Sequence, residues 1–359
     1  MAASVIVRAA IEDPDVATVV PVSMFARHVT ATEPESMLII VGEWEAFLVE
    51  EALRVLRLFA GPEAEPGVTY GDPGEGPARR VAIAENVEHI GVLYDPKSMA
   101  EARDWLTEVF GLPGSGYADA RGPWVLTLIL ALAALAWPLS KLLPRAVDPP
   151  RGAALRGRAF WRAALIPAVA TPLILAIGHV GFLPVIVGDY LAEHFLVYGA
   201  ITGALLFRET RGRPPGPRAR RGALLLAAFA VAAYALIAIG RPVDAYVSNF
   251  TPIPERLPLM ALLLAGTLPY FMADEWLTRG SGAPRWAYLA TKLLFLASLA
   301  LAIALDLGAL FFLIIMAPAL ALFFTVFGLL SGWAYRATGH PFVGAFANAL
   351  VFAFAIAVT

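Results

Sequence analysis

LIIVGEWE (residues 38–45) is a run of apolar, largely β-branched residues that ends in Gly42 and two acids. A short continuous apolar run of this kind is typical of a β-strand that is covered on both faces. A second segment, VEHIGVLYDP (residues 87–96), places His89 directly after another strand-like run. We expect the acid and the histidine to meet, because the carboxyl ends of neighbouring parallel strands share one edge of the sheet.

Helix-like and strand-like segments alternate around these two stretches, which predicts an α/β fold with a parallel sheet and right-handed crossovers. The predicted strands cover residues 16–23, 37–42 and 79–85, and the predicted helices cover residues 2–11, 45–60 and 99–110. A loop rich in Gly, Pro and acidic residues separates the second helix from the last strand. Glu43, Glu45 and His89 all follow strands and are therefore the candidate chemical groups of this part.

The chain changes character near residue 120. Residues 1–120 carry 20 acidic against 8 basic residues, whereas residues 121–359 carry 9 acidic against 19 basic ones. Apolar residues make up 59% of the whole chain, and the mean hydropathy is +0.69, far above the usual range of water-soluble proteins. We therefore predict an α/β domain at 1–120 and a multi-pass membrane domain at 121–359.

The second part contains apolar runs that are each long enough to cross a bilayer. They predict an all-α polytopic domain of about eight transmembrane helices, at residues 124–143, 160–177, 183–207, 223–239, 257–277, 286–305, 310–335 and 342–358. Basic residues gather in every second loop, with 16 on one side of the predicted membrane domain and 3 on the other. By the positive-inside rule, this places the N-terminal domain on the extracytoplasmic side of a cell membrane.

Composition also excludes several classes of protein. The chain has no cysteine, which rules out structural disulfides and thiolate zinc sites. The basic residues lie in short loops rather than on one folded surface, so we expect no nucleic-acid partner. Residues 1–10 have no apolar core of signal-peptide length. The sequence predicts a lipid bilayer as a partner, no cofactor and no bound metal.

The N-terminal part resembles the C-terminal half of the α/β-hydrolase family. GEWE at residues 42–45 is similar to the family's strand followed by an acid, and VEH at residues 87–89 is similar to its histidine loop. The opening MAASVIVR resembles the helix that directly follows the nucleophile turn. The resemblance implies that His89 is a general base toward a serine and that Glu45 fixes its tautomer, with Glu43 as a second choice of acid. It also implies a lipid or other acyl substrate, such as an ester, thioester or amide.

One part of the family's pattern is missing from the sequence. No Gly-x-Ser-x-Gly motif occurs, Ser4 falls inside a predicted helix, and Ser23 follows a different strand. By this register, Met1 would stand just after the absent serine. Either the true start lies upstream, which an unpaired apolar sheet edge favours, or the domain is degenerate. We therefore expect a hydrolase-like protein that is inactive as written, with a non-catalytic membrane scaffold or transporter as the alternative.

Ionisable residues inside the apolar runs form a separate candidate set, since such residues are costly in a membrane and often functional. They are His179, Asp189, Glu193, His194, Asp274, Glu275 and Asp306. The spacing of Asp189, Glu193 and His194 leaves a metal or proton site open as a third possibility. We expect the i,i+4 residues Glu275 and Arg279 to form an ordinary ion pair.

Overall fold

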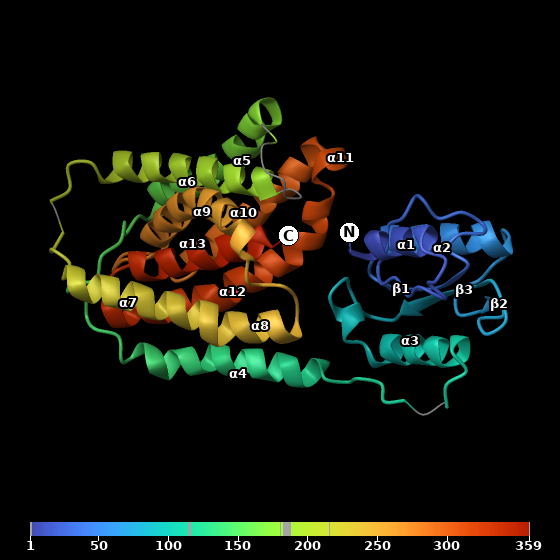
Figure 1. Ribbon diagram of the computed structural model, residues 1–359. Helices are drawn as coiled ribbons and strands as arrows, with labels where there is room; N and C mark the ends of the chain where they lie inside the picture. Colours follow the sequence, from blue (N-terminus) through green and yellow to red (C-terminus); the bar gives the residue numbers. More distant parts are fainter. Residues whose placement is uncertain (1, 114–115, 180, 182–187, 215, 359) are drawn as a thin grey trace. The chain divides into compact units, whose positions relative to one another are not determined.

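The structure is a computed structural model that describes residues 2–113, 116–179, 181, 188–214 and 216–358. The chain divides into two units, Met1–Leu126 and Thr127–Thr359, and each is described by itself (Figure 1). Met1, which the hydrolase resemblance sets beside an absent serine, lies outside the described residues.

The N-terminal unit is built on a small mixed sheet with the strand order β1-β3-β2. β1 (Ser36–Gly42) and β3 (Ala78–Ala84) are parallel, as the sequence predicts, but the two-residue β2 (Tyr70–Gly71) runs antiparallel to β3. The expectation of a purely parallel sheet is therefore wrong. The chain reverses between β2 and β3 because Gly71 has a φ of +86°, and a Cβ there would meet the Pro77 carbonyl oxygen at 2.0 Å.

The predicted first strand, residues 16–23, lies beside β1 without becoming a regular strand. Val19 and Val22 form isolated parallel bridges to Met37 and Ile40. Between them, Pro21 accepts a hydrogen bond from the Ile40 N–H at 3.1 Å but has no N–H of its own to donate. The segment therefore extends the parallel arrangement to the other side of β1 in an interrupted form.

Helices cover both faces of this sheet (Figure 1). α1 (Ala2–Glu12) and α2 (Ala46–Ala60) pack on the face formed by Met37, Ile39 and Val41. α3 (Pro96–Val109) covers the opposite face through Trp105, which contacts the cluster around Leu38 and Ile40. Successive residues of β1 thus point to opposite layers, and all seven are buried. The uninterrupted apolar run in the sequence reflects this burial on both faces.

The second unit is helical. Within the described residues, seven helices are long and apolar enough to cross a membrane, and the first of them begins at Gly122, just before the division between the units. The elements of this helical part are α4 (Gly122–Ser140), α5 (Gly157–Gly178), α6 (Gly188–Thr210), α7 (Arg221–Ala233), η2 (Tyr234–Ile239), α8 (Gly240–Tyr246), η3 (Pro254–Arg256), α9 (Leu257–Thr278), α10 (Ala287–Leu305), α11 (Leu307–Leu310), α12 (Phe312–Thr338) and α13 (Phe342–Ala357). One of the seven runs continuously from α7 through η2 to α8.

The expectation of about eight full-length spans needs correction at the C-terminal end. The eighth predicted span corresponds to α13, which has only 16 residues and therefore extends about 24 Å. That length falls short of the roughly 30 Å hydrocarbon core. The predicted start of the third span, residue 183, lies outside the described residues.

Aromatic side chains fill the centre of the helical unit. Phe195 of α6 stacks on Phe295 of α10 with ring centroids 4.8 Å apart, and Phe271 of α9 contacts Phe352 of α13 at the same distance. Glycine permits the closest helix contact, because a Cβ on Gly199 of α6 would lie 2.4 Å from the Tyr270 backbone nitrogen. α6, α9, α10 and α13 therefore form the packed centre of this unit.

Candidate functional site

Glu45 and His89, 44 residues apart in sequence, lie side by side in the N-terminal unit. Nδ1 of His89 is 2.5 Å from Oε1 of Glu45. The Glu45 side chain is only 7% exposed, whereas that of His89 is 37% exposed. The acid is thus held inside the protein while part of the imidazole reaches solvent. Nothing among the described residues forms a hydrogen bond with Nε2 of His89, so this nitrogen is open to another group.

Two further donors hold the second oxygen of Glu45. The Ser23 hydroxyl donates to Oε2 at 2.5 Å, and the Gly42 N–H donates to the same oxygen at 2.8 Å. Burial raises the pKa of Glu45, but the hydrogen bonds from His89, Ser23 and Gly42 outweigh burial and leave the pKa below its ordinary value. Glu45 is therefore an ionised acceptor that joins three segments of the chain.

The main chain around Gly42 brings the acid and the histidine together. A Cβ on Gly42 would lie 2.7 Å from the Val87 carbonyl oxygen and 3.1 Å from Oε2 of Glu45. The Trp44 N–H also donates to the Val87 carbonyl oxygen, at 3.2 Å. The end of β1 and the loop that carries His89 can approach this closely only because Gly42 has no side chain.

Glu43, the second choice of acid, has a different contact. Its Oε2 accepts a hydrogen bond from the Asn86 N–H at 2.8 Å. Asn86 has a φ of +59°, in the left-handed region, and lies in the turn that follows β3. Glu43 therefore fastens the turn ahead of His89, while Glu45 alone of the two acids contacts the imidazole in the described structure.

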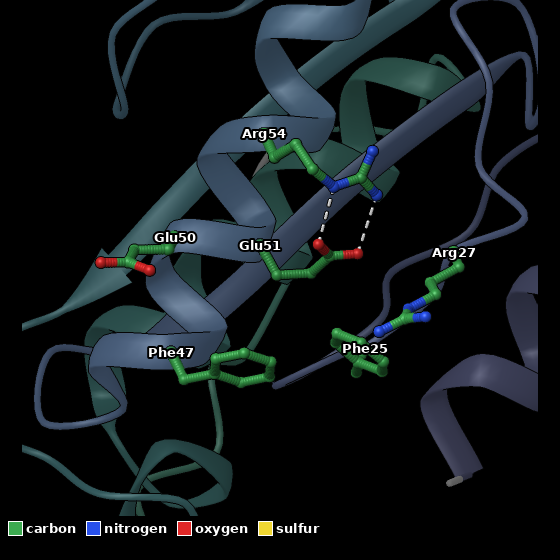
Figure 2. A pocket seen from close by; sticks show the side chains of 6 residues that line it. All are labelled: Phe25, Arg27, Phe47, Glu50, Glu51 and Arg54. Atoms are coloured by element: carbon green, nitrogen blue, oxygen red, sulfur yellow. Dashed lines mark hydrogen bonds and ion pairs between the residues drawn. The ribbon is translucent and has the colours of Figure 1, made fainter. Parts of the chain in front are cut away.

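The N-terminal unit has a pocket of about 470 Å³ (Figure 2). Two of its lining residues follow Ser23 and Glu45 by two positions in the sequence. Phe25 and Phe47 form its apolar wall, with ring centroids 5.3 Å apart. An ion pair between Glu51 and Arg54 of α2, at 2.7 Å, lies along another side. Arg27 and Glu50 complete the lining. This pocket was not among the sequence-based predictions, although Phe25 and Phe47 each lie two residues after a residue of the Glu45 hydrogen-bond group, Ser23 and Glu45.

The intramembrane residues Asp189, Glu193 and His194 do not converge on one point. Glu193 pairs with Nδ1 of His179 at 2.9 Å, and Asp189 lies 4.0 Å from Nε2 of the same imidazole. His194 is fully buried and faces the Ser298 hydroxyl at 3.1 Å instead. Among the described residues there is no group of three or more His, Cys, Asp or Glu placed to hold a metal ion. Asp306 accepts from the Ala309 N–H at 3.0 Å and so caps a helix.

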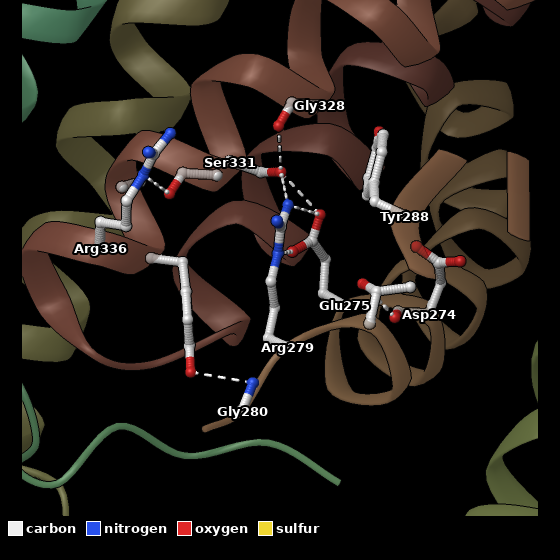
Figure 3. Close-up of polar contacts among 12 residues, drawn as sticks. Asp274, Glu275, Arg279, Gly280, Tyr288, Gly328, Ser331 and Arg336 are labelled. Carbon is white, nitrogen blue, oxygen red and sulfur yellow. Dashed lines mark hydrogen bonds and ion pairs between the residues drawn. The ribbon is translucent and has the colours of Figure 1, made fainter. Parts of the chain in front are cut away.

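The predicted ion pair between Glu275 and Arg279 is present and buried (Figure 3). Nε of Arg279 donates to Glu275 at 2.8 Å, and the Ser331 hydroxyl of α12 donates to the same carboxylate at 2.6 Å. Asp274 pairs with Lys292 of α10, and both side chains are 5% exposed. Lys292 is one of the 16 basic residues counted for the basic side of the membrane domain, although it falls within the predicted span 286–305. Counting it with the loop cations is wrong, because Lys292 lies inside α10 and pairs with Asp274 of α9.

Comparison of the chain with protein-family models, with curated proteins and with solved structures finds no match. What the structure supports directly is a small α/β unit with a mixed sheet and a multi-pass helical unit.

Proposed function

We propose that the N-terminal unit is an α/β-hydrolase-type acid–base site in a membrane-anchored protein that acts on an ester, thioester or amide. In this proposal His89 takes a proton from a nucleophile and returns it to the leaving group, and Glu45 fixes the imidazole tautomer. The observation that carries the proposal is the 2.5 Å contact between Nδ1 of His89 and Oε1 of Glu45. A carboxylate on Nδ1 holds the proton there and leaves Nε2 as an acceptor.

The pocket beside the acid supports an acyl substrate. Phe25 and Phe47 offer an apolar wall close to Ser23 and Glu45, and both are substantially exposed, at 40% and 47%. An acyl chain could cover these rings while its carbonyl group lies toward the acid–histidine pair. The charge pattern of the membrane unit supports an extracytoplasmic position for this site, in or near the outer leaflet.

Among the described residues, no serine is hydrogen-bonded to His89 in the role of a nucleophile. Ser4 lies within α1, and the Ser23 hydroxyl donates to Glu45 rather than to His89. We therefore expect residues 1–359 alone to show no turnover of p-nitrophenyl butyrate. Turnover that disappears in His89→Ala would contradict this expectation and would instead support a nucleophile within the chain.

The general-base role of His89 has its own test, which does not depend on turnover. We expect ¹⁵N NMR of the full chain, labelled at histidine, to show neutral His89 protonated on Nδ1, with His89→Ala identifying the signal. Glu45→Gln should change the tautomer, whereas Glu43→Gln, with its contact to Asn86, should not. A neutral His89 protonated on Nε2 would end the proposal, since it could not accept a proton there.

A non-catalytic scaffold or transporter is the second candidate, and one observation favours it. Glu45 accepts hydrogen bonds from Ser23 and Gly42 as well as contacting His89, so the group can serve simply to join three segments. A purely structural role predicts that His89→Gln, which keeps a donor near Glu45, preserves every property of the protein. The hydrolase-type role predicts that this variant loses the acid–base behaviour of the site.

A further inference from the structure

A groove of about 490 Å³ opens on the helical unit between α6, α9 and the start of α13. Thr210, Arg151 and His340 line it together with residues of the last turns of α6, and Gly199 and Pro269 line it farther along α6 and α9. Thr210 follows Gly199 by eleven positions in α6, so the two residues are about 16 Å apart along the helix axis. The groove therefore runs from the loop region into the membrane-spanning part of the unit.

Small residues on α6 create this groove. Gly199, Ala200, Gly203 and Ala204 share one face of the helix and all line the groove. Gly199 is packed against α9, whereas a Cβ on Gly203 would meet no atom within 4 Å. Phe207, 71% exposed, forms an outer wall. On a membrane-spanning helix, such an open apolar channel faces lipid.

Arg151 supplies a charge at the loop end. Its main chain is fixed, because its N–H donates to the Gly339 carbonyl oxygen at 2.9 Å and its own carbonyl oxygen accepts from the Tyr335 hydroxyl at 3.0 Å. Its guanidinium lies 5.3 Å above the Trp276 ring. No carboxylate or other acceptor among the described residues contacts that guanidinium. The planar group thus lies on an aromatic face, and none of its N–H donors has an acceptor among the described residues, a geometry suited to a phosphate.

We propose that this groove binds one anionic phospholipid, with its phosphate on Arg151 and an acyl chain along the small-residue face of α6. Charge complementarity favours this occupant, since Arg151, which has no ion-pair partner in the described part of the chain, lies at the end of the groove nearest the basic loops. The apolar part of the groove, which extends from Arg151 along α6, favours a lipid with an acyl chain over a free phosphate. The site lies wholly within the helical unit and does not depend on the function proposed for Glu45 and His89.

The test uses the full chain in detergent, titrated with dioleoyl-phosphatidylglycerol or dioleoyl-phosphatidylcholine and followed by native mass spectrometry. Both lipids carry a phosphate, but the choline cation makes phosphatidylcholine neutral overall and is repelled by Arg151. We therefore expect the anionic lipid to bind about fivefold more tightly, the ratio that corresponds to about 1 kcal/mol for one basic side chain. Arg151→Gln should remove this preference. Gly203→Leu should weaken both lipids by filling the channel.

Two matched variants serve as controls. Arg218→Gln removes another exposed cation from the basic loops, and Gly222→Leu enlarges a glycine of α7 that also has open space around it. Both should bind lipid like the wild type. Equal affinity for the two lipids in the wild-type protein, or an equal loss in Arg218→Gln, would overturn the proposal. Displacement of the lipid by an equal concentration of glycerol 3-phosphate would also overturn it, because the groove would then recognise phosphate without the chain.

Discussion

Gly42 is the residue on which the geometry of the acid–histidine pair depends. Any side chain there would enter the space of the Val87 carbonyl oxygen, which lies in the loop leading to His89. Since backbone cannot move as freely as the end of a side chain, the end of β1 and the loop that contains Val87 would have to move apart. The same methyl group would press on Glu45, so packing and the site are coupled at one position.

We expect Gly42→Ala to destabilise the N-terminal unit by about 1–3 kcal/mol, the usual cost of overpacking. Because the sequence contains no cysteine, the reactivity of one introduced thiol can be measured without interference from other thiols. Ala52→Cys places a single thiol at a site that is 1% exposed, and its reactivity in urea reports opening of the unit. Gly76→Ala, where a Cβ meets nothing within 4 Å, is the control. Equal urea midpoints for the two variants would contradict the prediction.

The lowered pKa of Glu45 predicts a specific acid sensitivity. A carboxyl whose pKa is lower in the folded than in the unfolded state contributes stability above its ordinary value of 4.5. This contribution is lost as the pH falls from 4.5 through the folded pKa. In the Ala52→Cys background, Glu45→Gln should therefore lose less stability over this range than the parent. Ser23→Ala, which removes one hydrogen bond to Glu45, should be intermediate. Parallel curves for all three proteins would refute the prediction.

At the scale of single elements, local patterns predict the structure well where burial is uniform or strictly periodic. The runs that become β1 and β3 are continuous because both faces of the sheet are covered, and the apolar stripe of residues 45–60 corresponds closely to α2. The start of α3 was missed by three residues. Its signal was present, since Asp95 accepts from the Ser98 N–H at 2.8 Å and Pro96 occupies the first helical position.

The remaining elements depend on contacts that sequence patterns do not record. β2 is a strand only because Gly71 reverses the chain onto β3. The meeting of Glu45 with His89 could be expected from the shared edge of parallel strands, whereas the contact from Ser23 depends on a left-handed residue, with a φ of +49°, after an irregular strand. The partner of Lys292 could not be predicted from its own segment, because Asp274 lies on another helix.

The buried pair of Asp274 and Lys292 predicts a non-additive response. Lys292→Met leaves a carboxylate without its cation and should cost about 3–5 kcal/mol, whereas Asp274→Leu combined with Lys292→Met should cost less. Unfolding of the full chain in mixed micelles measures both. Arg162→Met, which breaks a pair with Glu209 in which Arg162 is 59% exposed, should cost no more than about 1 kcal/mol. A double variant that costs more than Lys292→Met alone would show that the buried charges are not coupled.

For the whole molecule, the distribution of basic residues among the loops and the bounds of the helices predict one membrane topology. The basic loops follow α4, α6 and α9, and removing Lys292 from the loop cations does not alter this alternation. The seven candidate spans among the described residues, from α4 to α12, predict that the N-terminal unit and the end of α12 lie on opposite sides of a membrane. Because the shorter α13 comes after α12, it does not change the side of the membrane that is predicted for the earlier loops. The sequence could predict this alternation because each span is long and apolar by itself.

We predict that the N-terminal unit and the loop after α8 lie outside the cytoplasm, opposite the loop after α6. Since the chain has no cysteine, single cysteines can map each side. Thr32→Cys, Ser248→Cys and Arg218→Cys alter exposed residues of these three regions. In right-side-out vesicles, an impermeant maleimide should label the first two, and Arg218→Cys should react only after permeabilisation. The reverse pattern would invert the topology and would place Glu45 and His89 in the cytoplasm, where an outer-leaflet substrate is out of reach.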